Sequence, residues 1–213
     1  LVSYGTDEPA FEFNADGSYK GLLVEPAATN LCLQSEDFGT TWTGVSGFDL
    51  NATTAPDGTS TADRIRGDGL GGGDTQLYRN QTITVTAEAT YTASVFAKAD
   101  ALSWIRVGDA GSTPFAFFDL SNGVVGTTGG TDDESIEDYG NGWYRCSITW
   151  TQAAGDTSFV FRISIAEDDN DLIVPRLPIT ASSVFLWGAQ VEAGPIATSY
   201  IPTTDAQVIR AKD

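Results

Sequence analysis

The side chains best suited to contact a sugar are the aromatic and cationic residues within strand-like stretches. Aromatic rings stack on sugar rings, and arginine forms bidentate hydrogen bonds with carboxylate or sulfate groups. The candidates are Lys98, Trp104, Arg106, Trp143, Arg145 and Arg162, with Tyr78 on a less regular stretch. Their types predict a saccharide-binding surface with some preference for acidic glycans.

The stretch "NGWYRCSITW" (residues 141–150) shows how a strand would place these residues. Side chains alternate across a strand, so Trp143 and Arg145 share one face. The opposite face is apolar and consists of Tyr144, Cys146, Ile148 and Trp150. If the cation-bearing strands are neighbours in one sheet, their cations and exposed tryptophans gather on its outer, concave surface. The alternative is that they are ordinary outward residues that pair with nearby carboxylates or lie along the sheet.

Catalytic chemistry has little support in the sequence. The chain contains no histidine, which excludes Ser-His-Asp and Cys-His catalysis as well as histidine-ligated metals. The 29 acidic residues could supply the carboxylate pair of a glycosidase, but they concentrate in glycine-rich loops and no pair stands out. We therefore expect no enzymatic activity. Cys32 and Cys146 lie in apolar runs and are expected as buried thiols, with a single disulfide as the alternative.

Charge and hydropathy limit the classes of partner. The net charge of −18 argues against nucleic acid, because phosphate binding requires a basic surface. No apolar run approaches the length of a membrane span, so membrane insertion is not expected.

The sequence predicts that these residues lie on short strands of one antiparallel, all-β domain. Apolar or alternating runs are separated by clusters of Gly, Asn, Asp and Pro, and helix should be confined to short pieces. The expected strands are Gly21–Val24, Asn30–Leu33, Thr61–Arg66, Gln76–Val85, Tyr91–Lys98, Ser103–Val107, Phe115–Asp119, Trp143–Thr151, Thr157–Ile165 and Ser182–Glu192.

Five segments, in order along the chain, resemble a structural-protein domain of tailed phages, of the tail-fibre or head-fibre type. They are "GLLVEPAATNLCLQSEDF" (Gly21–Phe38), "APDGTSTADRI" (Ala55–Ile65), "YTASVFAKAD" (Tyr91–Asp100), "FDLSNGVVGT" with "GNGWYRCSIT", and "VFLWGAQVEAGPIATSYIPT" (Val184–Thr203). Such domains are similar to galactose-binding-like carbohydrate-binding modules. The resemblance implies a jelly-roll β-sandwich of two antiparallel sheets over residues 21–205. An N-terminal extension or arm (1–20) and a C-terminal tail (206–213) would flank it.

The resemblance also implies a place and a role. The chain would be a non-catalytic decoration or fibre module on the capsid or tail surface that binds host or environmental polysaccharide. Its partners would be the polysaccharide and other virion proteins, and it would form a homo-oligomer on the virion. Two alternatives stay open: a purely structural virion protein without a glycan ligand, and a polysaccharide-degrading tail enzyme.

A structural calcium ion is a further implication, because jelly rolls of this type often hold one near the first and last strands. By resemblance its ligands would come from Glu36, Asp37 and Glu192, with solvated carboxylates as the alternative. No cofactor is required. The resemblance makes Trp42 a plug at one end of the sandwich, and strand alternation places Trp150 and Trp187 in the core.

Overall fold

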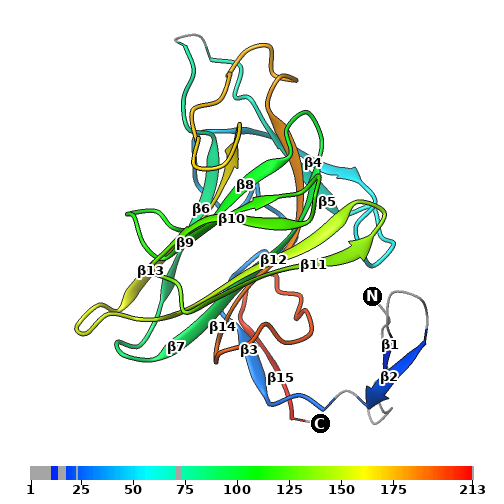
Figure 1. Ribbon diagram of the computed structural model, residues 1–213, viewed down its shortest axis with the longest axis vertical. Coiled ribbons are helices and arrows are strands. Elements are labelled where there is room, and N and C mark those ends of the chain that lie inside the picture. The colour runs from blue at the N-terminus through cyan, green and yellow to red at the C-terminus, as the bar shows by residue number, and fades with distance from the viewer. Residues whose placement is uncertain (1–10, 14–17, 23, 71–72, 213) are drawn as a thin grey trace.

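The protein is a sandwich of two antiparallel β-sheets, as the computed structural model shows in Figure 1. The structure describes residues 11–13, 18–22, 24–70 and 73–212, and within these ranges it contains fifteen strands and no helix. It follows that no helix of the described part of the chain could cross a membrane.

The first sheet has five strands and carries most of the site discussed below. In spatial order they are β10 (Val124–Gly129), β9 (Phe115–Asp119), β8 (Trp104–Asp109), β13 (Ser158–Ala166) and β6 (Tyr78–Thr84).

The second sheet has six strands and packs against the first. In spatial order they are β11 (Asp133–Gly140), β12 (Trp143–Thr151), β7 (Thr90–Ala99), β14 (Ser183–Ala193), β5 (Ala62–Arg66) and β4 (Gly47–Thr53).

The chain passes repeatedly from one sheet to the other, which is the connectivity of a jelly roll. It crosses between β5 and β6, β6 and β7, β7 and β8, β10 and β11, β12 and β13, and β13 and β14. Every strand pair is antiparallel. The predicted all-β sandwich of two antiparallel sheets is therefore confirmed.

The main core lies between the two sheets and is formed by alternate residues of each strand. Ile105 and Phe118 of the five-stranded sheet meet Cys146, Ile148 and Trp150 of the six-stranded sheet, and all five are buried. Trp42 closes the core beside Phe38 and Phe161, with ring centroids 4.9 and 5.7 Å away. Cys32 and Cys146 are buried free thiols, so the disulfide alternative is not realised.

The strands that pattern analysis misses are edge strands. β4, β10 and β11 each close one edge of a sheet, and β11 has the polar sequence "DESIEDYG". An edge strand pairs on one side only and is largely exposed, so it needs charged or polar residues rather than an apolar alternation. β11 joins β12 through Asn141 and Gly142, whose φ angles of 54° and 79° are those of a type I′ turn. The Asn-Gly pair was therefore a sound turn signal.

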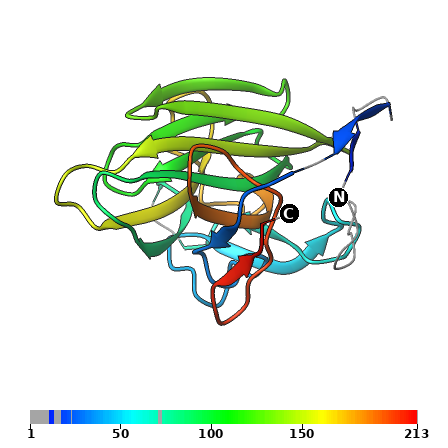
Figure 2. The same cartoon turned by 90° about the horizontal axis from the view of Figure 1, so that it is seen from below.

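Two short strand pairs lie outside the sandwich sheets. β3 (Ala28–Asn30) pairs with β15 (Val208–Arg210), which places a strand within the predicted C-terminal tail. β1 (Phe11–Phe13) and β2 (Tyr19–Leu22) form a hairpin that stands apart from both sheets in Figures 1 and 2. The hairpin includes the described residues of the predicted N-terminal arm.

Candidate functional site

The two sheets divide the predicted sugar-contacting residues into two groups. Lys98, Trp143 and Arg145 lie on β7 and β12 of the six-stranded sheet. Tyr78, Trp104, Arg106 and Arg162 lie on β6, β8 and β13 of the five-stranded sheet. One common surface was expected only if these strands were neighbours in one sheet, and this condition is not met, because β7 and β12 belong to one sheet and β6, β8 and β13 to the other. The two groups occupy opposite outer faces of the sandwich.

Trp143 is buried, which contradicts its expected exposure. Only 2% of its surface is accessible, and its indole Nε1 donates a hydrogen bond to the carbonyl oxygen of Thr54 at 3.1 Å. It belongs to a second apolar cluster with Ala55, Ala62, Phe96 and Trp187. Trp143 does lie on the face of β12 that alternation predicted, but the segment containing Thr54 and Ala55 covers that face.

Trp187 belongs to this second core cluster as well, so its predicted burial in a hydrophobic core is confirmed.

Arg145 is similarly enclosed, with 4% of its surface accessible. One terminal nitrogen, Nη2, donates to Ser94 Oγ at 3.1 Å, and the guanidinium lies 5.3 Å from the centroid of the Phe96 ring. Lys98 is half-buried and lies between Trp143 and Phe185 in the strand register. Trp143 and Arg145, which share one face of the strand as expected, therefore cannot stack on or bind a ligand from solvent.

The remaining candidates form one continuous group on the outer face of the five-stranded sheet. Tyr78, Ser164 and Arg106 are aligned across three strands, and Arg162 is in the next row. Phe115 of β9 extends the group on its other side, opposite Gly108. We call this group the aromatic–arginine face, and it consists of Tyr78, Trp104, Arg106, Phe115 and Arg162.

Stacked rings and guanidinium groups give this face its geometry. The guanidinium carbon of Arg162 lies 3.8 Å from the Tyr78 ring centroid, and that of Arg106 lies 4.8 Å from the Phe115 centroid. Arg106 is buried, with 7% of its surface accessible, and donates from Nη2 to the carbonyl oxygens of Asp109 at 3.0 Å and Ser112 at 2.7 Å. Arg162 is half-buried and is the more accessible of the two arginines. Burial, and to a smaller extent repulsion from Arg162, lowers the pKa of Arg106 to about 10. Arg106 therefore remains charged at neutral pH.

Two glycines of β10 make room for the aromatic rings. A Cβ atom at Gly126 would lie 2.6 Å from Trp104 Cζ3, and one at Gly129 would lie 2.6 Å from Phe115 Cε1. The rings of Trp104 and Phe115 thus lie across the backbone of the edge strand, where any side chain would collide with them. Phe115 and the two glycines were not among the predicted site residues, and no strand was expected between Asp119 and Trp143, where β10 lies.

The carboxylates near this face are occupied by other donors. Asp109 accepts hydrogen bonds from the backbone N–H groups of Val160 and Gly111. Asp119 accepts from the turn that follows β9, and Asp169 accepts from the N–H and hydroxyl of Thr127. None of the three forms an ion pair with Arg106 or Arg162 in the described part of the structure.

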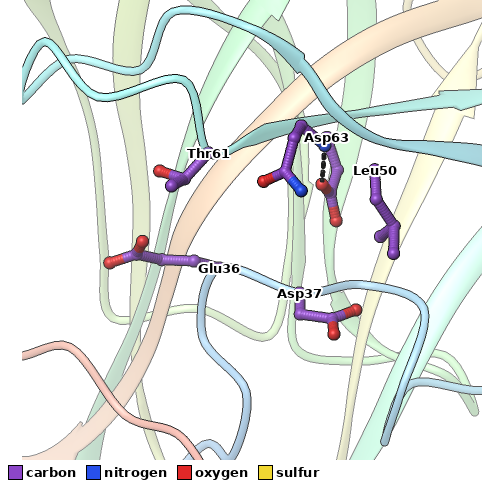
Figure 3. Close-up of a pocket in the computed structure, with 6 residues that line it drawn as sticks. Glu36, Asp37, Leu50, Thr61 and Asp63 are labelled. Atoms are coloured by element: carbon purple, nitrogen blue, oxygen red, sulfur yellow. Dashed lines mark hydrogen bonds between the residues drawn. The ribbon is translucent and has the colours of Figure 1, made fainter.

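A small pocket lies elsewhere, at the end of the sandwich near β4 and β5 (Figure 3). It has a volume of about 180 Å³ and is lined by Glu36, Asp37, Leu50, Asn51, Thr61 and Asp63. Asp63 accepts hydrogen bonds from the backbone N–H groups of Phe38 and Asn51, both at 2.9 Å. Burial, reinforced by the charges of Asp37 and Glu36, raises the pKa of Asp63 to about 6 despite those bonds.

The three residues predicted as calcium ligands do not gather at one point. No group of three or more potential metal ligands occurs among the residues that the structure describes. Glu192 is buried, and its carboxylate accepts hydrogen bonds from Gln190 Nε2 and from the N–H and hydroxyl of Thr198. Glu36 accepts from the Tyr200 hydroxyl, and Asp37 caps the turn at Gly39 and Thr40. Among the described residues, Glu36, Asp37 and Glu192 thus have separate hydrogen-bond partners, and a calcium ion bound by them stays a prediction.

Comparison with known proteins gives structural neighbours only. No protein-family model matches the chain, and no curated protein matches it. One structural neighbour is the enzymatically active domain of tailspike protein 4 of bacteriophage CBA120, at a TM-score of 0.46 and 10% identity. The match covers 77% of this chain and 21% of the tailspike chain.

Two further neighbours match over more of their own length. A structure described as "CBM4 structure and function" has a TM-score of 0.35 and 22% identity over 76% of this chain and 84% of its own. A carbohydrate-binding module from Cellvibrio mixtus lichenase 5A, in complex with cellotriose, has a TM-score of 0.34 and 12% identity over 83% and 100%. At such scores the fold assignment rests on the strand order itself.

Proposed function

We propose that this protein is a non-catalytic module that binds polysaccharide through the aromatic–arginine face. The observation that carries the proposal is the arrangement of Trp104 and Tyr78. Both aromatic side chains are half-buried on the outer face of one sheet, and the half-buried Arg162 lies over Tyr78. A partly exposed aromatic ring stacks on the apolar face of a sugar, and neighbouring N–H groups bind its hydroxyls.

Binding without hydrolysis agrees with the hydrogen bonds of the carboxylates near the face and in the pocket. A glycosidase needs two carboxylates that are free to act as acid, base or nucleophile. Asp109, Asp119 and Asp169 near the face are engaged as hydrogen-bond acceptors of the backbone. Asp63 has a raised pKa, but both of its oxygens hold backbone N–H groups in place. These carboxylates serve as structural acceptors.

A place on a phage virion is the second part of the proposal. The ordered resemblance between Gly21 and Thr203 to tailed-phage structural domains supports it. Many copies on one particle would bring many faces to the same polysaccharide, so that weak binding at each site produces tight overall attachment. The partners would then be the polysaccharide and other virion proteins, in a homo-oligomeric arrangement.

A purely structural role is favoured by a different surface. Leu70 and Leu177 are 61% and 54% exposed on two loops near one end of the sandwich. The loops are joined by the Thr75–Val174 bridge and by an ion pair between Asp68 and Arg176. Exposed apolar side chains on such fixed loops are typical of a surface that contacts another protein. Leu70→Ser with Leu177→Ser would impair assembly in this case and leave glycan binding intact.

The direct test of polysaccharide binding is a glycan array probed with a multimerised form of the protein. Trp104→Ala should abolish the signal, whereas Phe185→Ala, a half-buried aromatic on the opposite outer face, should not. Incubation with each bound glycan should release no reducing sugar. An array without any hit, or equal binding by wild type and Trp104→Ala, would refute the proposal.

A further inference from the structure

We infer that the aromatic–arginine face takes an acidic glycan, with a carboxylate or sulfate group of the sugar bound by the guanidinium of Arg162. This inference rests on the proposed function, since it names the class of polysaccharide for the same site. It follows from how the protein distributes its few cations.

Four of the eight arginines form ion pairs with acids in the described structure. Salt bridges join Arg64 to Asp100, Arg66 to Asp49, Arg176 to Asp68 and Arg210 to Glu25. With 29 acidic and only 11 basic residues, every arginine has abundant potential partners in this chain. The other four form no described ion pair. Arg79 and Arg145 are buried and donate to Ser46 and Ser94. Arg106 and Arg162 instead lie together on one outer face, where Arg162 is half-buried and has no described hydrogen-bond acceptor.

The hydrogen-bonding state of Arg162 points to a missing acceptor. Its Nε is buried without a partner, as are those of Arg79, Arg145 and Arg210, and is not accessible to a ligand. Its terminal nitrogens are different, because the side chain is half-buried and no described residue accepts a hydrogen bond from them. A charged donor that is partly withdrawn from water is stabilised by an acceptor. The nearby Asp109 and Asp169 cannot supply the acceptor, because their oxygens bind Val160, Gly111 and Thr127.

The Tyr78 ring holds Arg162 in a geometry suited to an oxyanion. At 3.8 Å the guanidinium lies over the ring, so one of its faces is covered and its N–H donors lie in the guanidinium plane. Planar N–H donors of this kind form paired hydrogen bonds with a carboxylate or a sulfate. The fixed stack also reduces the entropy lost when the anion binds.

Arg106 adds positive potential at the same place. Repulsion from Arg162 contributes to the lowered pKa of Arg106, so the two cations are close enough to interact. Arg106 itself is held by the carbonyl oxygens of Asp109 and Ser112 and is not free to turn away. An anion beside Arg162 would relieve this repulsion as well as supply acceptors.

A glycan with discrete acidic groups fits better than a nucleic acid. The net charge of −18 repels a dense polyphosphate over the rest of the surface. A sugar polymer offers both an apolar ring face for Trp104 and an isolated oxyanion for Arg162. An acidic glycan, rather than a nucleic acid, is therefore the expected ligand.

The test measures binding of the full chain to a neutral, a carboxylated and a sulfated polysaccharide: dextran, polygalacturonate and dextran sulfate. Arg162→Gln should weaken binding to at least one acidic polymer by about tenfold or more, the loss expected for a charge-assisted hydrogen bond. Arg64→Gln is the matched control, since it changes the net charge equally but removes an arginine already paired with Asp100. It should change affinity less than about twofold, the effect of one distant charge screened by salt. Melting curves verify that both variants are folded.

The three polymers also distinguish a carboxylate from a sulfate ligand. They further distinguish a failure of the acidic-glycan inference from a failure of polysaccharide binding as a whole. Selective binding of polygalacturonate or of dextran sulfate, lost in Arg162→Gln, supports a carboxylate or a sulfate ligand respectively. Equal binding of dextran and the acidic polymers, unchanged in Arg162→Gln but lost in Trp104→Ala, overturns the acidic class and leaves the proposed function standing. Failure to bind any polysaccharide overturns both. Equal affinity for single-stranded DNA and the acidic polymer overturns the glycan assignment.

Discussion

Arg162 of β13 stacks on Tyr78 of β6, with the guanidinium carbon 3.8 Å from the centroid of the ring. The two residues are diagonal neighbours on the outer face, because Arg162 is opposite Asn80 and Tyr78 is opposite Ser164. The contact therefore links an edge strand to the interior of the sheet. It also determines which way the donors of Arg162 point.

This stack should make a measurable contribution to stability. Tyr78→Leu and Arg162→Leu each remove one partner, and the double variant closes a thermodynamic cycle. A cation–π contact at a half-buried site predicts a coupling free energy of about 0.5–1 kcal/mol. Urea denaturation of the four proteins gives the value, and a coupling energy near zero would show that the stack is incidental.

Trp143 should prove structural and Trp104 functional. Trp143→Ala empties a buried site in the second apolar cluster, so we expect a loss of about 3–5 kcal/mol in the free energy of unfolding. Trp143→Phe should cost less and leave glycan affinity unchanged. Trp104→Ala should show the reverse pattern, with a small loss of stability and a large loss of affinity. Denaturation curves and binding isotherms measured on the same preparations would distinguish the two roles.

The contrast between these tryptophans shows what alternation predicts. Alternation assigns the face of a strand, and for Trp143, Arg145, Cys146 and Ile148 it assigned the face correctly. It does not say which sheet the strand joins or what lies over the sheet. Those depend on contacts between distant segments, such as the hydrogen bond from Trp143 to Thr54, 89 residues earlier.

The edge of the sandwich is where sequence patterns carry least information. No strand was expected where β10 lies, yet Gly126 and Gly129 of β10 accommodate the rings of Trp104 and Phe115. In the sequence alone, a glycine such as Gly126 suggests a turn. Once β10 is paired with β9, the same glycine is needed because a side chain there would collide with an aromatic ring. Only the register between β9 and β10 shows which of these two explanations applies.

Asp63 should make the stability of the protein depend on pH. Its folded pKa of about 6 lies above its ordinary value of 3.8, so protonation is favoured in the folded state. Its contribution to stability is then fully present below about pH 4 and is lost as pH rises through about 6. Relative to Asp63→Asn, the wild type should lose about 1–2 kcal/mol between pH 4 and 7, less than the full shift implies because the pocket admits water.

The variant Asp63→Asn is the reference because it cannot titrate. It will be less stable at all pH values, since its amide N–H₂ group would face one of the donors from Phe38 and Asn51. Only the pH dependence of the difference is informative. Parallel stability profiles for the two proteins from pH 4 to 7, measured by urea denaturation, would disprove the assignment.

Glu192 should act as a structural acceptor rather than a calcium ligand. Its carboxylate holds Gln190 and Thr198, so Glu192→Gln places an N–H₂ group against existing donors. We expect a loss of about 1–3 kcal/mol in the free energy of unfolding, as for other buried groups left unsatisfied. Any shift in melting temperature on adding Ca²⁺ should be the same in the variant as in the wild type. A Ca²⁺ shift that disappears in Glu192→Gln would restore its role as a ligand.

Gly126 should control the position of Trp104 without touching the ligand. An added methyl group would lie 2.6 Å from Trp104 Cζ3 and 2.5 Å from Asp169 Oδ1, so both side chains would have to move. We expect Gly126→Ala to cost about 1–3 kcal/mol of stability through overpacking and to weaken glycan binding nearly as much as Trp104→Ala. If the effect on affinity acts through the ring, Gly126→Ala should have no further effect in a Trp104→Ala background. Isothermal titration of the two single variants and the double variant decides, because additive losses would mean that β10 itself contacts the glycan.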